Sequence, residues 1–400
     1  PSKTAYKYGE TFQPAGMVVT AYYTDETSRA VTGYTYSPTG ALAMNNTTIT
    51  ISYTEGSVTK QTTQAITVAK VLASIEITTP PTKTAYFSGE TFNPAGMVVT
   101  AHYNDGSSAA VSGYTYSPNG ALAAGNNTIT VSYSEGGVTR TDTQAITVTT
   151  ISNTLNSNSW ATIKAVSDAG QGDNYWDVGD TKAITINGNV GNTNFSNLSI
   201  NVYIIGFNHN SAREGNNRIH FKIGKIGGTQ VALVDSQYGS GVSSSGYFSM
   251  NTSNTNSGGW NNSYMRKTIC PAFLAALPTA WQNIIAACTK YSDNTGGGSN
   301  TASYVTATSD KIWLLSEMEV QGTRSYANSA EANYQKQYDY YRNGNSKVKY
   351  QHTATTSACI WWLRSVFASY AAYFCRVGTD GSAAYPGAYR SYGFAPGFDI

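Results

Sequence analysis

Four cysteines and four histidines are the side chains of this sequence whose chemistry could support metal binding or catalysis. The cysteines form no CxxC pair and have no neighbouring histidine, so we expect no zinc site. Isolated cysteines are ordinarily buried free thiols, although a disulfide between Cys359 and Cys375 stays open. The histidines are scattered, so none is an obvious base for a nucleophile. We therefore expect no metal, no cofactor and no catalysis. The residues concerned are Cys270, Cys288, Cys359, Cys375, His102, His209, His220 and His352.

Two charged residues lie beside apolar runs. Glu317 is part of "KIWLLSEMEV" and Arg364 is part of "WWLRS". A functional interpretation makes them a catalytic acid and an anion clamp. A lone buried charge is too costly to persist, so we favour the structural interpretation, in which the two residues form a buried ion pair.

The C-terminal segment 365–400 has the residue types of a binding surface. Tyr370, Tyr373, Tyr385, Tyr389 and Tyr392 lie among Ala, Ser and Gly, and the segment contains no Lys, Glu, Gln, Met or Trp. Tyr offers a large flat contact area at a small entropy cost, and Ser and Gly offer adaptability. An ordinary surface loop rich in these residues is the alternative. We expect the five tyrosines to gather on one exposed face, next to a tight turn at Asp380-Gly381.

Composition excludes several classes of partner. The net charge is +2 and charged residues make up 12% of the chain, so no basic field attracts nucleic acid. No apolar run reaches the roughly 18 residues that span a bilayer, and we expect no membrane insertion. The oligomeric state cannot be read from these features.

The first 150 residues are two copies of one unit. "KTAYKYGETFQPAGMVVTAYYTD" begins at Lys3 and "KTAYFSGETFNPAGMVVTAHYND" begins at Lys83, and the register holds without a gap to "TQAITV" in both copies. Apolar residues alternate with polar ones in "GMVVTAYY" and "TTITISYTEG", which predicts antiparallel strands with one buried face. We place the repeats at 1–70, truncated at its N-terminus, and at 71–150. The chain is then expected to be the C-terminal piece of a longer protein.

The remainder, 151–400, has a different pattern. We interpret "TTISNTLNSNS" as a polar linker and "SWATIKAVSDAG" as a helix that ends at Gly170. "AITI", "NLSINVYIIGF" and "RIHFKIGKIGG" predict strands, and Pro271 and Pro278 mark two helix starts. "KIWLLSEMEV" and "CIWWLRS" predict strands buried on both faces. The fold class is multidomain, with two all-β sandwiches followed by an α+β domain.

The repeats resemble the bacterial immunoglobulin-like domains that are strung along surface adhesins and phage structural proteins. This resemblance implies spacers that hold another domain away from a surface. Glycan binding by the repeats themselves is the alternative, but neither copy has an aromatic or charged cluster beyond its strands.

Five stretches of the C-terminal part together resemble a family of uncharacterised bacterial and phage domains. They are "SWATIKAVSDAG…YWDVGD", "WNNSYMR", "KIWLLSEMEV", "WWLRS" and "GFAPGFDI". That family is similar to the C-type-lectin-like fold, and many members look like variable proteins of diversity-generating retroelements. In such systems a reverse transcriptase miscopies template adenines, and the altered copy replaces the 3′ end of the gene. Randomised AAC and AAT codons never encode Lys, Glu, Gln, Met or Trp. These are the five residue types that segment 365–400 lacks.

The resemblance separates a framework from a variable region at about 365–392. Glu317, Trp361, Trp362 and Arg364 are expected to be structural. The expected variable, ligand-binding positions are Phe367, Tyr370, Ala371, Ala372, Tyr373, Arg376, Gly378, Tyr385, Pro386, Gly387, Tyr389, Arg390 and Tyr392. The partner is then a variable protein or glycan target, and the location is a phage virion or a bacterial surface.

Two other functions stay open. A carbohydrate-binding adhesin module without diversification would bind sugars on aromatic faces, since the calcium-site signatures EPN, QPD and WND are absent. The lectin-like fold also hosts formylglycine-generating enzymes, which use two cysteines near the C-terminus. Cys359 lies in an apolar run, so a structural role is expected for it.

Overall fold

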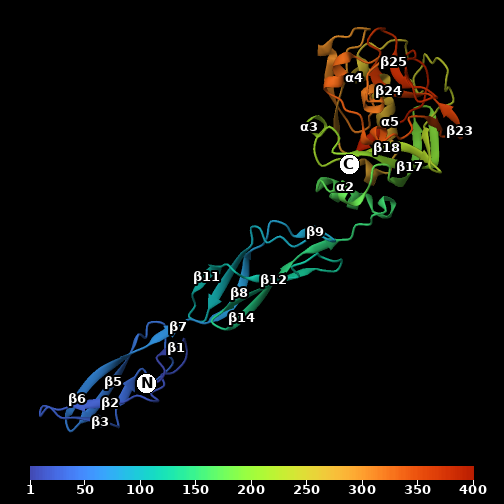
Figure 1. Cartoon of the computed structure of the whole chain (residues 1–400). Helices are drawn as coiled ribbons and strands as arrows, with labels where there is room; N and C mark the ends of the chain where they lie inside the picture. The colour runs from blue at the N-terminus through green and yellow to red at the C-terminus, as the bar shows by residue number, and fades with distance from the viewer. The chain divides into compact units, whose positions relative to one another are not determined.

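The computed structural model describes residues 1–400 and divides into two compact units, Pro1–Thr150 and Ile151–Ile400. The first unit holds only strands, and the second combines strands with short helices (Figure 1). A helix long and apolar enough to cross a membrane is not found.

The two repeats of the first unit have the same succession of strands, except that the second begins with one further strand, β8. Alternating apolar residues bury one face, as in β10, where Val99, Ala101 and Tyr103 point into the core. The first repeat contains β1 (Ala5–Lys7), β2 (Val19–Tyr22), β3 (Ser28–Val31), β4 (Thr35–Ser37), β5 (Thr48–Glu55), β6 (Val58–Ala65) and β7 (Thr67–Ala69). The second contains β8 (Leu72–Thr79), β9 (Ala85–Phe87), β10 (Val98–Tyr103), β11 (Ser108–Val111), β12 (Thr115–Ser117), β13 (Thr128–Glu135), β14 (Val138–Ala145) and β15 (Thr147–Thr149).

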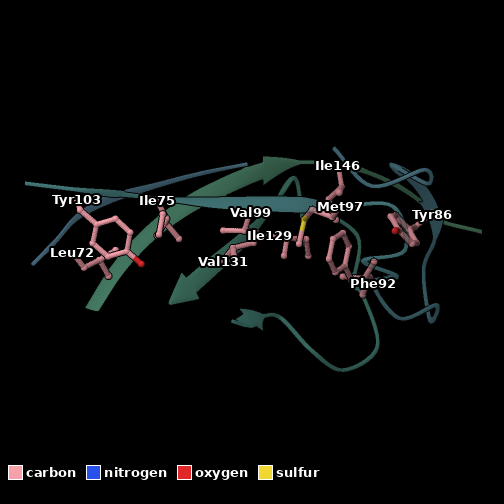
Figure 2. Packing of buried hydrophobic residues seen from close by; sticks show 12 residues of the cluster. Leu72, Ile75, Tyr86, Phe92, Met97, Val99, Tyr103, Ile129, Val131 and Ile146 are labelled. Carbon is pink, nitrogen blue, oxygen red and sulfur yellow. The ribbon is translucent and has the colours of Figure 1, made fainter. Parts of the chain in front are cut away.

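Most strand pairs in the repeats are antiparallel, as predicted. The order is β4-β5-β6 in the first repeat and β12-β13-β14 in the second, while β1 with β7 and β9 with β15 are parallel pairs. Each repeat has its own apolar core, and Figure 2 shows that of the second, where Phe92 and Met97 lie beside Ile129 and Val131.

The C-terminal unit is built on one large, mainly antiparallel sheet with the order β16-β17-β18-β19-β22-β23. The last strand, β27, returns to the centre of this sheet and pairs with β18, so the C-terminus lies beside β18 (Figure 1). The strands are β16 (Thr181–Val190), β17 (Thr193–Phe207), β18 (Ile219–Ile226), β19 (Thr229–Ala232), β20 (Cys288–Asp293), β21 (Val305–Asp310), β22 (Lys349–Gln351), β23 (Ala354–Cys359), β24 (Trp361–Val366), β25 (Phe374–Val377), β26 (Ala383–Ala384) and β27 (Gly397–Asp399).

The helices of this unit are short. The predicted helix at "SWATIKAVSDAG" is present as α1, with the Ser159 side chain capping its first turn and Gly170 at a φ of 68° after its end. The helices are α1 (Trp160–Asp168), α2 (Gly172–Tyr175), α3 (Ser211–Glu214), α4 (Gly259–Asn262), α5 (Cys270–Ala275), α6 (Thr279–Gln282), α7 (Glu317–Gln321) and α8 (Asp339–Arg342), with single turns at η1 (Leu155–Ser157), η2 (Met265–Ile269), η3 (Ala302–Tyr304) and η4 (Ser329–Asn333).

Two predictions for this unit are wrong. The segment taken as a polar linker is packed from Ile151 onward, because Ile151 and Leu155 are buried and the Trp176 indole donates to the carbonyl of Ser152. "KIWLLSEMEV" is not one strand, because Ser316 and Glu319 cap each other's backbone N–H groups and begin helix α7.

Candidate ligand-binding surface

The C-terminal tail emerges from a fully buried strand. All six residues of β24, from Trp361 to Val366, are buried, and β25 runs antiparallel to it with Val366 opposite Phe374. Residues 367–373 therefore form a loop that leaves the core and returns to it. The indoles of Trp361 and Trp362 donate to the carbonyls of Lys347 and Phe248, which holds the base of the loop in place.

Five aromatic rings gather where this loop meets two neighbouring segments, and we call them the aromatic patch. Within it, the rings of Phe367 and Tyr385 stack with centroids 4.2 Å apart, and those of Tyr370 and Tyr373 stack at 4.6 Å. Tyr373 also stacks on Tyr385 at 5.6 Å. The patch consists of Tyr326, Phe367, Tyr370, Tyr373 and Tyr385.

The patch is open to solvent at two of its rings. Tyr370 is 54% exposed and Tyr385 is 40% exposed, and they are among the few large apolar side chains of the protein that are exposed. Phe367 and Tyr373 are half-buried between them. Stacking fixes these rings before any ligand arrives, so little side-chain entropy remains to be lost on binding.

The side chain of Asn256 holds the loop by hydrogen bonds to the main chain of the loop. This fully buried amide donates from Nδ2 to the carbonyls of Tyr370 and Tyr373, both at 2.9 Å, and to that of Phe367 at 3.3 Å. Its own N–H donates to the Ala371 carbonyl at 2.7 Å. These bonds use backbone atoms of the loop alone, so they do not depend on which side chains the loop carries.

A glycine segment packs against the outer side of the same loop. Gly298 has a φ of 73°, and a Cβ there would lie 2.9 Å from the backbone nitrogen of Ala371. Only glycine allows this approach without a shift. Gly297 donates its N–H to Oδ1 of Asn256, which links the two supports. Sequence reasoning missed both, although three consecutive glycines at 296–298 signal a close backbone contact.

The predicted ion pair between Glu317 and Arg364 is wrong, although both residues are fully buried. The Glu317 carboxylate instead accepts the backbone N–H groups of Ser325, Tyr326 and Ala327, at 2.7–3.2 Å. Residues two apart on a helix point in different directions, so Glu317 and Glu319 do not both face Arg364. Glu319 is the one that pairs with it. Glu317 thus fixes the segment that brings Tyr326 into the aromatic patch, a contribution that the sequence did not indicate.

Arg364 and Glu319 form a bidentate pair below the loop. The guanidinium Nη1 and Nη2 lie 2.5 and 2.7 Å from the two carboxylate oxygens, and Nε donates to the hydroxyl of Ser292. Burial alone raises the pKa of Glu319, but the charges of Arg364 and Lys290 outweigh burial and hold that pKa below its usual value. The pair stays ionised and anchors β24 to α7.

Tyr389 and Tyr392 do not join the patch, so the prediction of a single cluster of five tyrosines is wrong. The Tyr392 ring packs edge-on against Trp362 at 5.5 Å and against Tyr238 at 5.8 Å. Tyr389 lies against Gly241, where a Cβ would meet its ring at 2.4 Å. The chain turns after Gly387, which pairs with Tyr373, and this carries the last tyrosines away along a different segment.

The other predicted variable positions have mixed environments. Ala371 is exposed, whereas Ala372, Arg376, Pro386 and Arg390 are half-buried. Gly378 and Gly387 are buried, and a Cβ at either would lie within 2.6 Å of a neighbouring Asp or Asn side chain, so these two do not offer an exposed surface. The Asp380-Gly381 turn is present, with Gly378 donating to the Ser382 carbonyl at 2.7 Å and Gly381 at a φ of 84°.

The four cysteines are free and buried. Burial raises the pKa of Cys359 to about 11 and that of Cys375 well above its ordinary value. A nucleophilic cysteine requires the opposite shift.

One buried cluster has the spacing of metal ligands. Glu214, His220 and Cys288 lie together, as do His209, Glu214 and Glu319. The Lys290 ammonium nitrogen lies between these groups, 2.7 Å from a carboxylate oxygen of Glu214 and 3.7 Å from one of Glu319. A protein cation therefore balances these carboxylates without a metal ion.

Comparison with known proteins supports the two-part organisation. Residues 79–150 match the bacterial Ig-like domain (group 3) family, and residues 231–400 match a domain of unknown function (DUF6273). The chain is also similar to a pectate lyase L of Thermoclostridium stercorarium, with 36% identity over 104 residues. That stretch is 26% of this chain and spans only 8% of the length of the lyase. The second repeat is thus an immunoglobulin-like domain.

Proposed function

We propose that the C-terminal unit is a ligand-binding domain whose contact surface is the aromatic patch. The observation that carries this proposal is the placement of stacked, partly exposed rings on a loop held by main-chain bonds to Asn256. A binding surface of this kind gains affinity from large flat side chains that are already ordered.

The same architecture suits diversification. Side chains at Phe367, Tyr370, Tyr373 and Tyr385 can change while the Asn256 amide and the Gly298 backbone still fix the loop. The restricted vocabulary of segment 365–400 is what adenine-directed mutagenesis of AAC and AAT codons produces. The protein is accordingly the variable protein of a diversity-generating retroelement with a C-type-lectin-like domain, and it binds different protein or glycan targets in different variants.

The immunoglobulin-like repeats serve as spacers in this proposal. They present the binding domain on a phage virion or a bacterial surface. Support comes from the family match of residues 79–150 and from the close similarity of the two copies.

A displayed library tests the proposal. Phe367, Tyr370, Tyr373 and Tyr385 are randomised together, and a matched control library randomises four exposed residues of the first repeat: Lys7, Gln13, Thr35 and Thr39. We expect most members of the patch library to stay folded and to yield binders to several unrelated proteins, at a rate well above that of the control. If most patch members unfold, or if both libraries yield binders at the same low rate, the proposal is wrong.

Carbohydrate binding without diversification is the second candidate. The exposed ring of Tyr370, stacked on the half-buried ring of Tyr373, also suits the flat face of a sugar. In that case one fixed glycan binds, chelators have no effect, and the patch library loses this binding without gaining new targets.

A further inference from the structure

A groove of about 310 Å³ lies against β16, the outer strand of the large sheet in the C-terminal unit. Its walls are mainly apolar, with Trp160 from the start of α1, and Pro278 and Trp281 from the segment of α6. Thr185 and Ser199, both exposed, add hydroxyl groups, and no residue that lines the groove is charged. Its volume lies at the lower end of the range for small-molecule sites, which is about 300–1,000 Å³.

The free edge of β16 is closed at two points and open between them. The N–H of Ala183 donates to Oδ1 of Asn156 at 2.8 Å, and the N–H of Asn187 donates to the Ala276 carbonyl at 3.0 Å. Residues two apart on an antiparallel strand turn their backbone groups to the same side, so the N–H and the carbonyl of Thr185 also point outward. Neither group forms a hydrogen bond within the protein. Thr185 therefore offers the groove one donor and one acceptor, side by side.

The aromatic walls of the groove are held in place by the core. The rings of Trp160 and Trp281 stack with centroids 4.9 Å apart, and Trp281 packs edge-on against Phe398 at 4.8 Å. Trp281 is only 2% exposed, yet its indole N–H has no acceptor in the protein. A buried indole N–H ordinarily finds a partner, so a wall of the groove contains a further unused donor.

These features restrict the class of ligand. An added strand cannot continue along β16, because Asn156 and Ala276 already occupy the edge on either side of Thr185. Free amino acids and short peptides carry charged ends, which this uncharged lining does not match. The groove therefore fits a small neutral molecule that has one amide N–H beside an oxygen acceptor, an apolar face and further hydroxyls. An N-acetylated amino sugar combines these groups.

We propose that the groove binds one N-acetylhexosamine unit of a neutral glycan. The acetamido N–H donates to the Thr185 carbonyl, and the oxygen of the neighbouring sugar hydroxyl accepts from the Thr185 N–H. The acetamido methyl group and the C–H face of the ring pack against the indoles and Pro278. The groove lies outside segment 365–392, so this site is independent of what the aromatic patch binds.

Titration of the full chain of residues 1–400 with N-acetylglucosamine tests the proposal. Saturation-transfer NMR is expected to show saturable binding, with the strongest transfer to the acetamido methyl group. Glucose is expected to bind at least about fivefold more weakly, because it lacks both the amide N–H and the buried methyl group. N-acetylalanine N-methylamide, a neutral peptide unit, is the competing ligand and is expected to bind more weakly than the sugar.

Three substitutions locate the binding. Ala280→Trp fills the groove and is expected to abolish binding, whereas Thr279→Trp, at an exposed neighbour that does not line the groove, is not. Thr185→Pro removes the outward N–H at an edge position that tolerates proline, and it is expected to weaken binding at least about fivefold. Tyr370→Ala in the aromatic patch should leave binding unchanged.

Four results would overturn the proposal. They are the absence of saturable binding by N-acetylglucosamine, equal binding of glucose, tighter binding of the peptide unit, and loss of binding in Tyr370→Ala but not in Ala280→Trp. The last result would place the sugar on the aromatic patch. If Thr185→Pro fails to fold, the exposed pair Ala280→Trp and Thr279→Trp still decides between the groove and other sites.

Discussion

Replacing Asn256 with Ala is expected to release the loop that carries the aromatic patch. The side chain makes three bonds of 2.9 Å or less, to the carbonyls of Tyr370 and Tyr373 and from the N–H of Gly297. At about 1 kcal/mol for each net bond, their loss costs about 3 kcal/mol, and buried carbonyls left without partners raise the cost toward about 5 kcal/mol. For a domain of this size, 3 kcal/mol lowers the melting temperature by about 6–12 °C.

Calorimetry and hydrogen exchange measure the two parts of this expectation. The transition of the C-terminal unit should move to lower temperature, and residues 366–374 should exchange faster at temperatures where the rest of the unit stays protected. The exposed Asn254 is the matched control, and Asn254→Ala should change stability by no more than about 0.5 kcal/mol. If the Asn256→Ala protein has an unchanged melting temperature and unchanged hydrogen exchange in residues 366–374, Asn256 does not hold the loop and the reasoning is refuted.

Three further outcomes follow from the buried charges and thiols. Glu319→Ala leaves Arg364 without its carboxylate and should lower the free energy of unfolding by about 3–5 kcal/mol. As a control, Asp168→Ala removes an exposed ion pair and should cost less than about 1 kcal/mol. Equal effects of the two substitutions would contradict the buried pair. Burial raises the pKa of Glu331 to about 7 in the folded protein. The folded state therefore keeps a proton that the unfolded state releases near pH 4.5. Because of this difference, the contribution of Glu331 to stability falls as the pH rises from about 4.5 to 7. Glu331→Gln should therefore gain stability relative to the original protein over that window, and a pH-independent difference would show that the carboxyl is not perturbed. A thiol reagent should label none of the four cysteines until the C-terminal unit unfolds, and rapid labelling of Cys359 in the native protein would revive a reactive role.

Regular elements with local signals were predictable from the sequence. The alternation in "GMVVTAYY" indicated β2, Gly170 marked the end of α1, and the apolar run "CIWWLRS" indicated the buried β24. The Asp380-Gly381 turn was also readable from its residue types.

Elements that depend on tertiary contacts were not predictable in the same way. Ser316 and Glu319 carried a capping signal, but the apolar residues before them suggested a continuing strand. Whether Glu317 or Glu319 meets Arg364 depends on the direction in which α7 packs, which no local pattern fixes. Asn256 lies more than a hundred residues from the loop that it holds, and nothing in its own neighbourhood indicates this contact.

Part of the candidate site was within reach of the sequence. The tail vocabulary led to Phe367, Tyr370, Tyr373 and Tyr385, and these four rings do stack together. Tyr326 was missed because it comes from a distant segment that Glu317 positions through backbone bonds.

The central claim is that the patch residues vary on a constant framework. The most direct measurement is the DNA sequence around the gene. We expect a near-copy of its 3′ end beside a reverse transcriptase gene, differing only opposite adenines, with the differences falling in the codons for Phe367, Tyr370, Tyr373 and Tyr385 and none in the codons for Trp361 or Arg364. The absence of such a copy, or differences spread evenly through the framework codons, would contradict the account.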